Sequence, residues 1–304
     1  MTLTSVPGVE VGHYTDSVGL TGVTVMTFPE PNVATGEVRG AAPGTREIAL
    51  LQPGSRIENI QALVFSGGSA YGLASADGVV TGLVADGKGH RTLNDIIVPI
   101  VPTAIIFDLV SGDPEARPGP DEGAVAYAAR SADPVAMGNV GAGTGATVAG
   151  WRGRDAVRKG GLGSAAVNLG DVVVGALAVV NAVGDVFTLE GEALTDGPLV
   201  PPIEPNPPSQ AELANTTLLA IVTNARLSRT DLMRLNVRGH DAMGACIRPG
   251  HTRYDGDISY AVSCGPLEAD PDAVGEAAFV AAGRAIEAAI RAAQPAGGIP
   301  AMGG

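Results

Sequence analysis

Aromatic residues, cysteines and basic residues are all scarce in this sequence. Only 4% of its 304 residues are aromatic whereas 45% are hydrophobic, so the core must be built from aliphatic side chains. The 43 glycines indicate many turns and close approaches of the backbone. A chain of this length can bury a sizeable core, and the composition is typical of a tightly packed α/β protein.

Positive charge is also short, because 19 Lys and Arg residues face 32 Asp and Glu residues and the formal net charge is −13. This balance argues against nucleic acid and against an anionic membrane surface as partners, since both require basic patches. No apolar run approaches the roughly 20 residues that span a bilayer, and the N-terminus lacks the features of a signal peptide. We therefore expect a cytoplasmic protein without membrane association.

The two cysteines, Cys246 and Cys264, are too few for a disulfide framework and are interpreted as small core residues in a reducing compartment. No Cys or His pair has the spacing of zinc ligands. The histidines are interpreted as surface or satisfied core residues: His13, His90, His240 and His251. The sequence therefore predicts neither a metal nor a cofactor.

Hydrophobic patterning predicts strands and helices in both halves of the chain. Strands are expected within residues 9–15, 21–28, 60–68, 96–110, 171–187, 216–225 and 257–265. Helices are expected over 69–84, with Ser69 as N-cap, and over 121–132, 229–243 and 271–293. The glycine-rich segments "GAGTGA" and "KGGLGSAA" are interpreted as structural loops lining a pocket. Apolar strands of this kind predict sheets covered by helices.

The one linker-like segment is the proline-rich, exposed run 199–214. Too few strands follow it for a second domain, so we expect a single domain over 1–304. The run meets a predicted strand at Asn215-Thr216-Thr217. The structural interpretation of this seam is an Asn turn followed by a strand that begins with β-branched residues.

The functional interpretation is that the chain cleaves itself between Asn215 and Thr216 and frees Thr216 as an N-terminal nucleophile. A threonine hydroxyl is a weak nucleophile until a base removes its proton, and a free α-amine, with an ordinary pKa of about 7.7 to 8.0, titrates near neutral pH. Such an enzyme requires no histidine. Before cleavage, the same hydroxyl can attack the Asn215 carbonyl to form an ester that water hydrolyses. Composition alone leaves both interpretations open.

Eight sequence blocks occur together and in order between about Val9 and Gly265: "GVEVGHYTD…GVTV", "RGAAPGTRE", "SGGSAYGL", "AIIFDL", "GNVGAGTGATV", "KGGLGSA", "NTTLLAIVTNARLS" and "HTRYDGD". This ordered set resembles the self-processing aminopeptidase family, which includes L-aminopeptidase/D-amide esterases, β-aminopeptidases and nylon-oligomer hydrolases. The resemblance implies an α/β fold, an αββα sandwich built by an α chain (1–215) and a β chain (216–304) that stay together.

The resemblance also implies the chemistry. Thr216 matches the nucleophile and Asn181 the residue that stabilises the oxyanion, a role that suits an amide N–H. Asp255 and Asp257 match the pair that orients the nucleophile's amine. The implied substrate is a short peptide or a β- or ω-amino-acid amide, no cofactor is implied, and family members are commonly homo-oligomers, with a tetramer favoured here.

Two positions depart from the nylon-oligomer hydrolases. Gly150 stands where those enzymes carry a lysine, and Phe107 replaces a tyrosine. Three neighbours could supply the missing charge: Arg152, Arg154 and Lys159. We expect Phe107, Ser69 and Tyr71 to line the substrate pocket.

Two further functions stay open at this point. An acyltransferase of the ornithine acetyltransferase kind also generates an N-terminal threonine, although the sequence blocks fit the aminopeptidases better. A member that stays uncleaved and serves as a catalytically silent small-molecule-binding oligomer is suggested by Gly150 and Phe107. Cleavage and product analysis separate these three functions.

Overall fold

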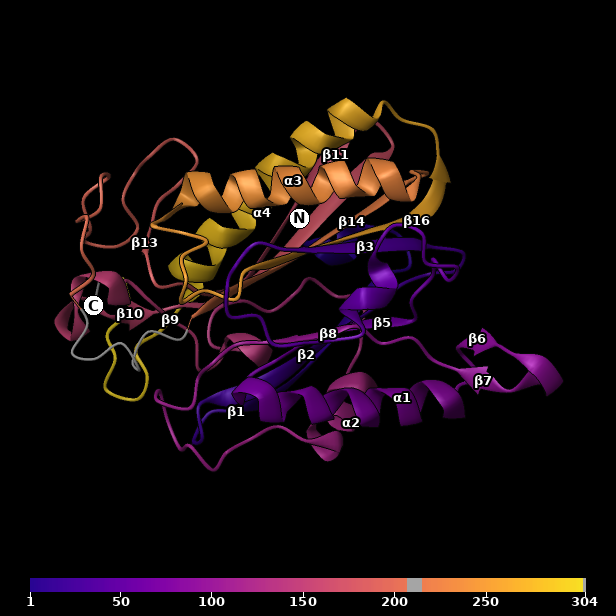
Figure 1. The fold of residues 1–304 in the computed structure, drawn as a ribbon, viewed down its shortest axis with the longest axis horizontal. Coiled ribbons are helices and arrows are strands. Elements are labelled where there is room, and N and C mark those ends of the chain that lie inside the picture. The colour runs from indigo at the N-terminus through magenta and orange to yellow at the C-terminus, as the bar shows by residue number, and fades with distance from the viewer. Residues whose placement is uncertain (207–214, 303–304) are drawn as a thin grey trace.

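Figure 1 shows a computed structural model that describes residues 1–206 and 215–302 as four layers in the order helices, sheet, sheet, helices. The helices are α1 (Ser75–Ala85), α2 (Pro120–Ala128), α3 (Arg229–Cys246) and α4 (Pro271–Ala292). This order confirms the predicted αββα sandwich. Within the described ranges, no helix combines the length and hydropathy needed to cross a membrane.

The first sheet is formed by the N-terminal part of the chain and is covered by α1 and α2. Its strands, in spatial order, are β1 (Glu10–Asp16), β2 (Thr21–Thr27), β5 (Ala62–Ser66), β8 (Thr103–Ile105) and β4 (Thr45–Arg46). Only the β5–β8 pair is parallel. A short hairpin of β6 (His90–Arg91) and β7 (Ile97–Val98) projects beyond this layer (Figure 1).

The second sheet draws on segments from both sides of the predicted linker and is covered by α3 and α4. Its strands, in spatial order, are β11 (Gly161–Leu169), β12 (Val172–Asn181), β14 (Thr216–Ala225), β16 (Ile258–Leu267) and β3 (Val33–Val38). Only β14 and β16 are parallel. The remaining two-stranded pairs are β9 (Thr147–Val148) with β10 (Arg158–Lys159) and β13 (Asp185–Val186) with β15 (Ile247–Arg248).

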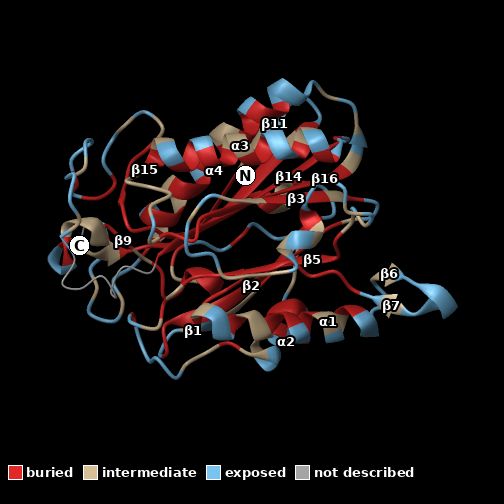
Figure 2. Ribbon diagram, viewed as in Figure 1, coloured by how far each residue is buried: buried red, intermediate tan, exposed pale blue. Residues whose placement is uncertain are grey.

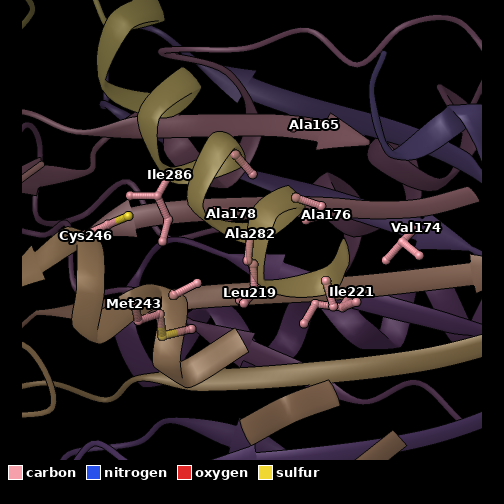
Figure 3. Packing of buried hydrophobic residues seen from close by; sticks show 14 of the residues in the cluster. Ala165, Val174, Ala176, Ala178, Leu219, Ile221, Met243, Cys246, Ala282 and Ile286 are labelled. Carbon is pink, nitrogen blue, oxygen red and sulfur yellow. The ribbon is translucent and has the colours of Figure 1, made fainter. Parts of the chain in front are cut away.

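Strand β14 explains how one sheet can serve two cores. Leu218 and Ala220 face the first sheet, whereas Leu219 and Ile221 pack under α3 and α4 together with Ala282 of α4 (Figure 3). Every residue of this strand is buried, as expected for a strand covered on both faces. Figure 2 shows the same pattern for both sheets, with exposed residues concentrated on the outer helices and the loops.

The helix ends follow simple capping chemistry. Ser228 caps α3 by accepting a hydrogen bond from the Asp231 N–H, and the Asp231 carboxylate accepts one from the Ser228 N–H. Asp270 caps α4 ahead of Pro271, the first helical residue. Both helices begin where the sequence predicted, and the strand 216–225 is also confirmed at both ends.

Three local predictions were wrong. "KGGLGSAA" is not a loop, since it runs into β11. Ser69 does not cap a helix, because it has a φ of +55° and lies in a 3₁₀ turn before α1. The segment 96–110 forms only the short strands β7 and β8, because its prolines interrupt the ladder.

Both cysteines are buried and unbridged, which confirms them as core residues. Of the predicted linker 199–214, residues 207–214 lie outside the described residues. The preceding part is largely exposed, with Ile203 96% exposed.

Gly163 in β11 permits the close packing of α4 on the second sheet. A Cβ there would lie 2.1 Å from the carbonyl oxygen of Ala285, in the helix backbone. We expect Gly163→Ala to lower the free energy of unfolding by about 1 to 3 kcal/mol, since the helix must shift. Gly244→Ala in α3 is the matched control, because its Cβ meets no atom within 4 Å. It should raise stability by about 0.5 to 1 kcal/mol. Urea unfolding measures both, and equal effects would contradict the packing argument.

Candidate active site

The four predicted catalytic residues lie together at one end of the second sheet. Thr216 is the first residue of β14 and Asn181 the last of β12, and the register pairs them directly across the ladder. Asp255 and Asp257 immediately precede β16, the parallel neighbour of β14. Each of the four is at most 3% exposed. The fold therefore brings residues from three strand ends into one buried group.

The peptide bond before Thr216 is held by specific contacts. The Asn215 N–H donates to the Tyr254 carbonyl (3.2 Å), and the Asn215 carbonyl oxygen accepts from the Gly256 N–H (2.9 Å) and from the Thr216 hydroxyl (2.6 Å). Gly256 must lack a side chain, because a Cβ would lie 2.6 Å from the Ala42 carbonyl and 2.8 Å from Thr216 Oγ. The hydroxyl and the carbonyl that precedes it are thus fixed next to each other.

The amide of Asn181 is oriented by its neighbours. Its Oδ1 accepts a hydrogen bond from the Thr147 N–H (2.9 Å), and its Nδ2 donates to the Phe107 carbonyl (3.2 Å). An amide NH₂ carries two protons, and this network uses one of them. No hydrogen bond among the described residues uses the second N–H.

Of the three basic residues named from the sequence, Lys159 contacts the peptide that holds Asn181. Its side chain is fully buried and its Nζ donates to the carbonyls of Thr144 and Ala146, both at 2.8 Å. Burial lowers the pKa of Lys159 to about 8. The Ala146 carbonyl belongs to the same peptide unit as the Thr147 N–H that holds Asn181. Lys159 and Asn181 therefore bind opposite edges of one peptide plane.

The two arginines near Gly150 do not bring positive charge to this group. Arg152 makes a bidentate ion pair with Asp185 (2.8 and 2.9 Å), and Arg154 is exposed. Gly150 begins the 3₁₀ turn Gly150–Arg152 and brings no charge. Since Lys159 is the buried one of the three basic residues, burial is the information that the sequence lacked.

The two aspartates hold different parts of the site. Asp257 Oδ1 accepts from the Thr217 N–H (2.6 Å), directly beside the nucleophile position. Asp255 accepts from the hydroxyl and N–H of Thr252 and from the Val183 N–H. Burial, followed by the negative charge of Asp257, raises the pKa of Asp255 to about 7. Two carboxylates this close and this buried cannot both ionise without cost.

His251 completes this group, although the sequence interpretation gave it no role in the site. Its Nδ1 lies 2.7 Å from Asp257 Oδ2. Burial lowers the pKa of His251, but the hydrogen bond to Asp257 and the charges of Asp257 and Asp255 outweigh it, so the net shift is upward. The stretch "HTRYDGD" contains all three residues, and their proximity in the chain was the available signal.

Asp108 is a further buried carboxylate that sequence reasoning missed. It follows Phe107 directly and accepts from the Thr21 hydroxyl (2.8 Å) and the Gly68 N–H (2.7 Å). Burial raises its pKa to about 6, against the opposing effect of these hydrogen bonds and of the Lys159 charge. Asp108 binds the ends of strands in the first sheet, and its neighbour Phe107 binds Asn181 in the second. The two sheets therefore meet at this point.

The residues predicted to line the pocket are spread out. Phe107 is half-buried and contacts Asn181 through its carbonyl. Ser69 is nearby, since its N–H donates to the Ile106 carbonyl. Tyr71 is 58% exposed and lies under the Arg117 guanidinium, 4.1 Å from the ring centre. No hydrogen bond or ring contact among the described residues joins Tyr71 to the Thr216 group.

A separate cavity of about 230 Å³ is lined by Thr27, Phe28, Pro29, Glu30, Gln61 and Lys88. It shares no residue with the Thr216 group. Because none of the predicted catalytic residues lines this cavity, it is not the candidate site. The candidate site is the buried polar group at the ends of the strands of the second sheet. In the described ranges, no cluster of three His, Cys, Asp or Glu residues could hold a metal ion.

Comparison with known families decides the assignment, since Peptidase family S58 matches residues 2–301. The chain belongs to this family. An uncharacterized aminopeptidase of Mycobacterium bovis is 38% identical, with 98% of this chain and 96% of the relative covered. A 6-aminohexanoate-oligomer endohydrolase of Paenarthrobacter ureafaciens is 31% identical, with 86% of this chain and 74% of the relative covered.

Solved structures agree on the fold of this S58 member. A Burkholderia sp. β-aminopeptidase superposes with a TM-score of 0.77 at 21% identity, covering 99% of this chain and 90% of the other. The L-aminopeptidase D-Ala-esterase/amidase of Ochrobactrum anthropi gives 0.76 at 22% identity, covering 96% and 86%. It is described as a variant of the Ntn hydrolase fold. Membership of the peptidase family, together with the aminopeptidase and endohydrolase relatives, makes the S58 chain a hydrolase of peptide or amide bonds.

Proposed function

We propose that this chain is an autoprocessed N-terminal-threonine hydrolase, cleaved between Asn215 and Thr216 into chains 1–215 and 216–304. One observation carries the proposal: the buried Thr216 hydroxyl lies 2.6 Å from the Asn215 carbonyl oxygen, at the first position of β14. A hydroxyl fixed against the preceding carbonyl can transfer that acyl group to itself. Asn181 across the ladder and Asp257 beside Thr217 then form the site that the cleavage opens.

Self-cleavage begins with attack of Thr216 Oγ on the carbonyl carbon of Asn215. The Gly256 N–H already donates to that carbonyl oxygen at 2.9 Å and stabilises the negative charge that develops there. Breaking the C–N bond leaves an ester on Oγ and frees the α-amine of Thr216, which takes up the hydroxyl proton. Water then hydrolyses the ester and releases the carboxylate of Asn215.

Turnover uses the same hydroxyl a second time. The freed amine accepts the Oγ proton as Thr216 attacks the substrate carbonyl, and the unused Nδ2–H of Asn181 donates to the oxyanion. The leaving amine departs with a proton, and water releases the acyl group from the ester. Asp257, held 2.6 Å from the Thr217 N–H, and Asp255 orient the Thr216 amine.

The names of the relatives support a substrate with a free amino group, such as a short peptide or a β- or ω-amino-acid amide. We expect release of p-nitroaniline from β-alanine or 6-aminohexanoate p-nitroanilide, and loss of turnover when the substrate amine is acetylated. Hydroxylamine added as acceptor should give a minor hydroxamate beside free acid. Hydroxamate as the dominant product would indicate a transferase, and no product at all would indicate a silent protein.

Lys159 offers a prediction within this function. Lys159→Met removes the side-chain donor to the buried Thr144 carbonyl and one of the two donors to the Ala146 carbonyl, which the Gly160 N–H still reaches at 2.9 Å. The peptide that orients Asn181 is thereby held less firmly. We expect kcat to fall at least about tenfold, since a loss of about 1.4 kcal/mol in transition-state stabilisation has that effect. The matched control is Lys88→Met. Lys88 is the only other lysine in the sequence, and its side chain is exposed. Unchanged kcat in Lys159→Met would remove Lys159 from the site.

A further inference from the structure

His251 makes an unusual double contact with one carboxylate oxygen. Its backbone N–H (3.1 Å) and its ring Nδ1 (2.7 Å) both reach Asp257 Oδ2. This requires a left-handed backbone, with a φ of +54°, which is uncommon for a residue other than glycine. Such a conformation is unfavourable and persists only where the surroundings impose it. The strained backbone of His251 therefore places both of its donors on Asp257.

The opposite oxygen of the same carboxylate binds the nucleophile strand. Asp257 Oδ1 accepts from the Thr217 N–H at 2.6 Å, so Asp257 forms a bridge between His251 and the residue next to Thr216. We propose, on the basis of the function proposed above, that His251 is a positioning residue that holds the Asp257 side chain aimed at the Thr216 amine. It acts through Asp257 and does not contact the substrate itself.

Charge balance explains why a histidine is useful there. Asp255 and Asp257 are both about 1% exposed, and two ionised carboxylates in so dry a site repel each other. A cationic imidazole on Asp257 offsets that repulsion. Burial and the charge of Asp257 raise the pKa of Asp255 to about 7. This upward shift indicates that little positive charge near Asp255 offsets the negative charge of the pair.

Among the described residues, the ion pairs of Asp257 include only the one with His251, and the groups that pack on His251 from other elements bring no second positive charge to Asp257. His240 of α3 packs edge-on against the His251 ring, with 4.9 Å between centres, and burial lowers its pKa to about 4. Its Nε2 lies 3.0 Å from the Glu37 carbonyl, and the Glu37 side chain pairs with Arg39 at 2.7 Å. His240 is thus neutral at pH 7, and His251 is the one of the two histidines whose pKa is shifted upward.

His251→Asn isolates the charge. Asparagine tolerates a left-handed φ better than most residues and keeps an N–H donor, so the backbone contact to Asp257 can survive. Losing the cation raises the pKa of the Thr216 amine and of Asp255, because less positive charge surrounds them. The acidic limb of the pH profile of kcat/KM should therefore move about one pH unit higher. Turnover below that limb should fall about tenfold, with KM within twofold.

The matched control is His90→Asn in the β6–β7 hairpin, which should leave the pH profile unchanged. A purely structural role for His251 predicts a lower yield of folded protein or a uniform loss of kcat, without displacement of the limb. An undisplaced limb in His251→Asn would overturn the proposal.

A second measurement separates this inference from the proposed function. The chain has only four histidines, so NMR titration of their ring protons can be assigned by single substitutions. The pKa of His251 should lie above the ordinary histidine value of about 6.5 and should fall by about one unit in Asp257→Asn. If the wild type hydrolyses no amide, the proposed function fails, and this titration alone decides whether His251 is the cation on Asp257. A His251 pKa at or below that ordinary value of about 6.5 would refute it.

Discussion

Thr216→Ala is expected to leave the protein as a single 30.4 kDa chain and to abolish amide hydrolysis. The substitution removes the one oxygen that lies 2.6 Å from the Asn215 carbonyl, so no ester can form and no α-amine is freed. Intact-mass analysis after prolonged incubation and a p-nitroanilide assay measure both losses. The expected reduction in turnover is complete within the detection limit.

Thr216→Ser is the control for this experiment because it retains the hydroxyl and removes only a methyl group. We expect it to split and to hydrolyse amides, although more slowly. A Thr216→Ala chain that still splits at the same bond would show that another group attacks Asn215. Cleavage without hydrolysis in Thr216→Ser would separate processing from turnover.

Asn181→Ala is expected to lower kcat by about 100- to 1,000-fold with little change in KM, because an oxyanion donor acts mainly in the transition state. Loss of the hydrogen bonds to Thr147 and Phe107 will also lower stability. Steady-state kinetics on protein shown to be folded by circular dichroism measure the catalytic part.

Asn224→Ala provides a matched comparison for that variant. Asn224 lies near the other end of β14, is also buried, and bonds the backbone of Val173 (2.7 Å) and Asp171 (3.1 Å). It should lose comparable stability while keeping kcat within about twofold. Equal losses of kcat in the two variants would mean that Asn181 is structural and that the oxyanion donor lies elsewhere.

The sequence predicted those parts of the fold in which local pattern and tertiary environment agree. Strand 216–225 was found at both ends because its apolar residues stop at polar boundaries, and α4 was found because Pro271 begins an alanine-rich amphipathic run. Strand β11 was missed because its glycines serve packing. Gly163 is small so that α4 can approach, and this requirement is invisible without the helix in place.

The candidate site was predictable only in part. Thr216, Asn181 and the aspartates follow from the family resemblance, and the structure places them together. The choice of Lys159 over Arg152 required knowing which side chain is buried and which pairs with Asp185. His251 required the left-handed turn that directs it to Asp257, which no residue pattern specifies.

The central claim is that the bond between Asn215 and Thr216 breaks to create the nucleophile. The most direct test is intact-mass spectrometry of freshly purified wild-type protein, followed by N-terminal sequencing of each polypeptide found. The account predicts two chains, one of which begins Thr216-Thr217-Leu218. One stable chain of 30.4 kDa, or a cut at any other bond, would contradict it.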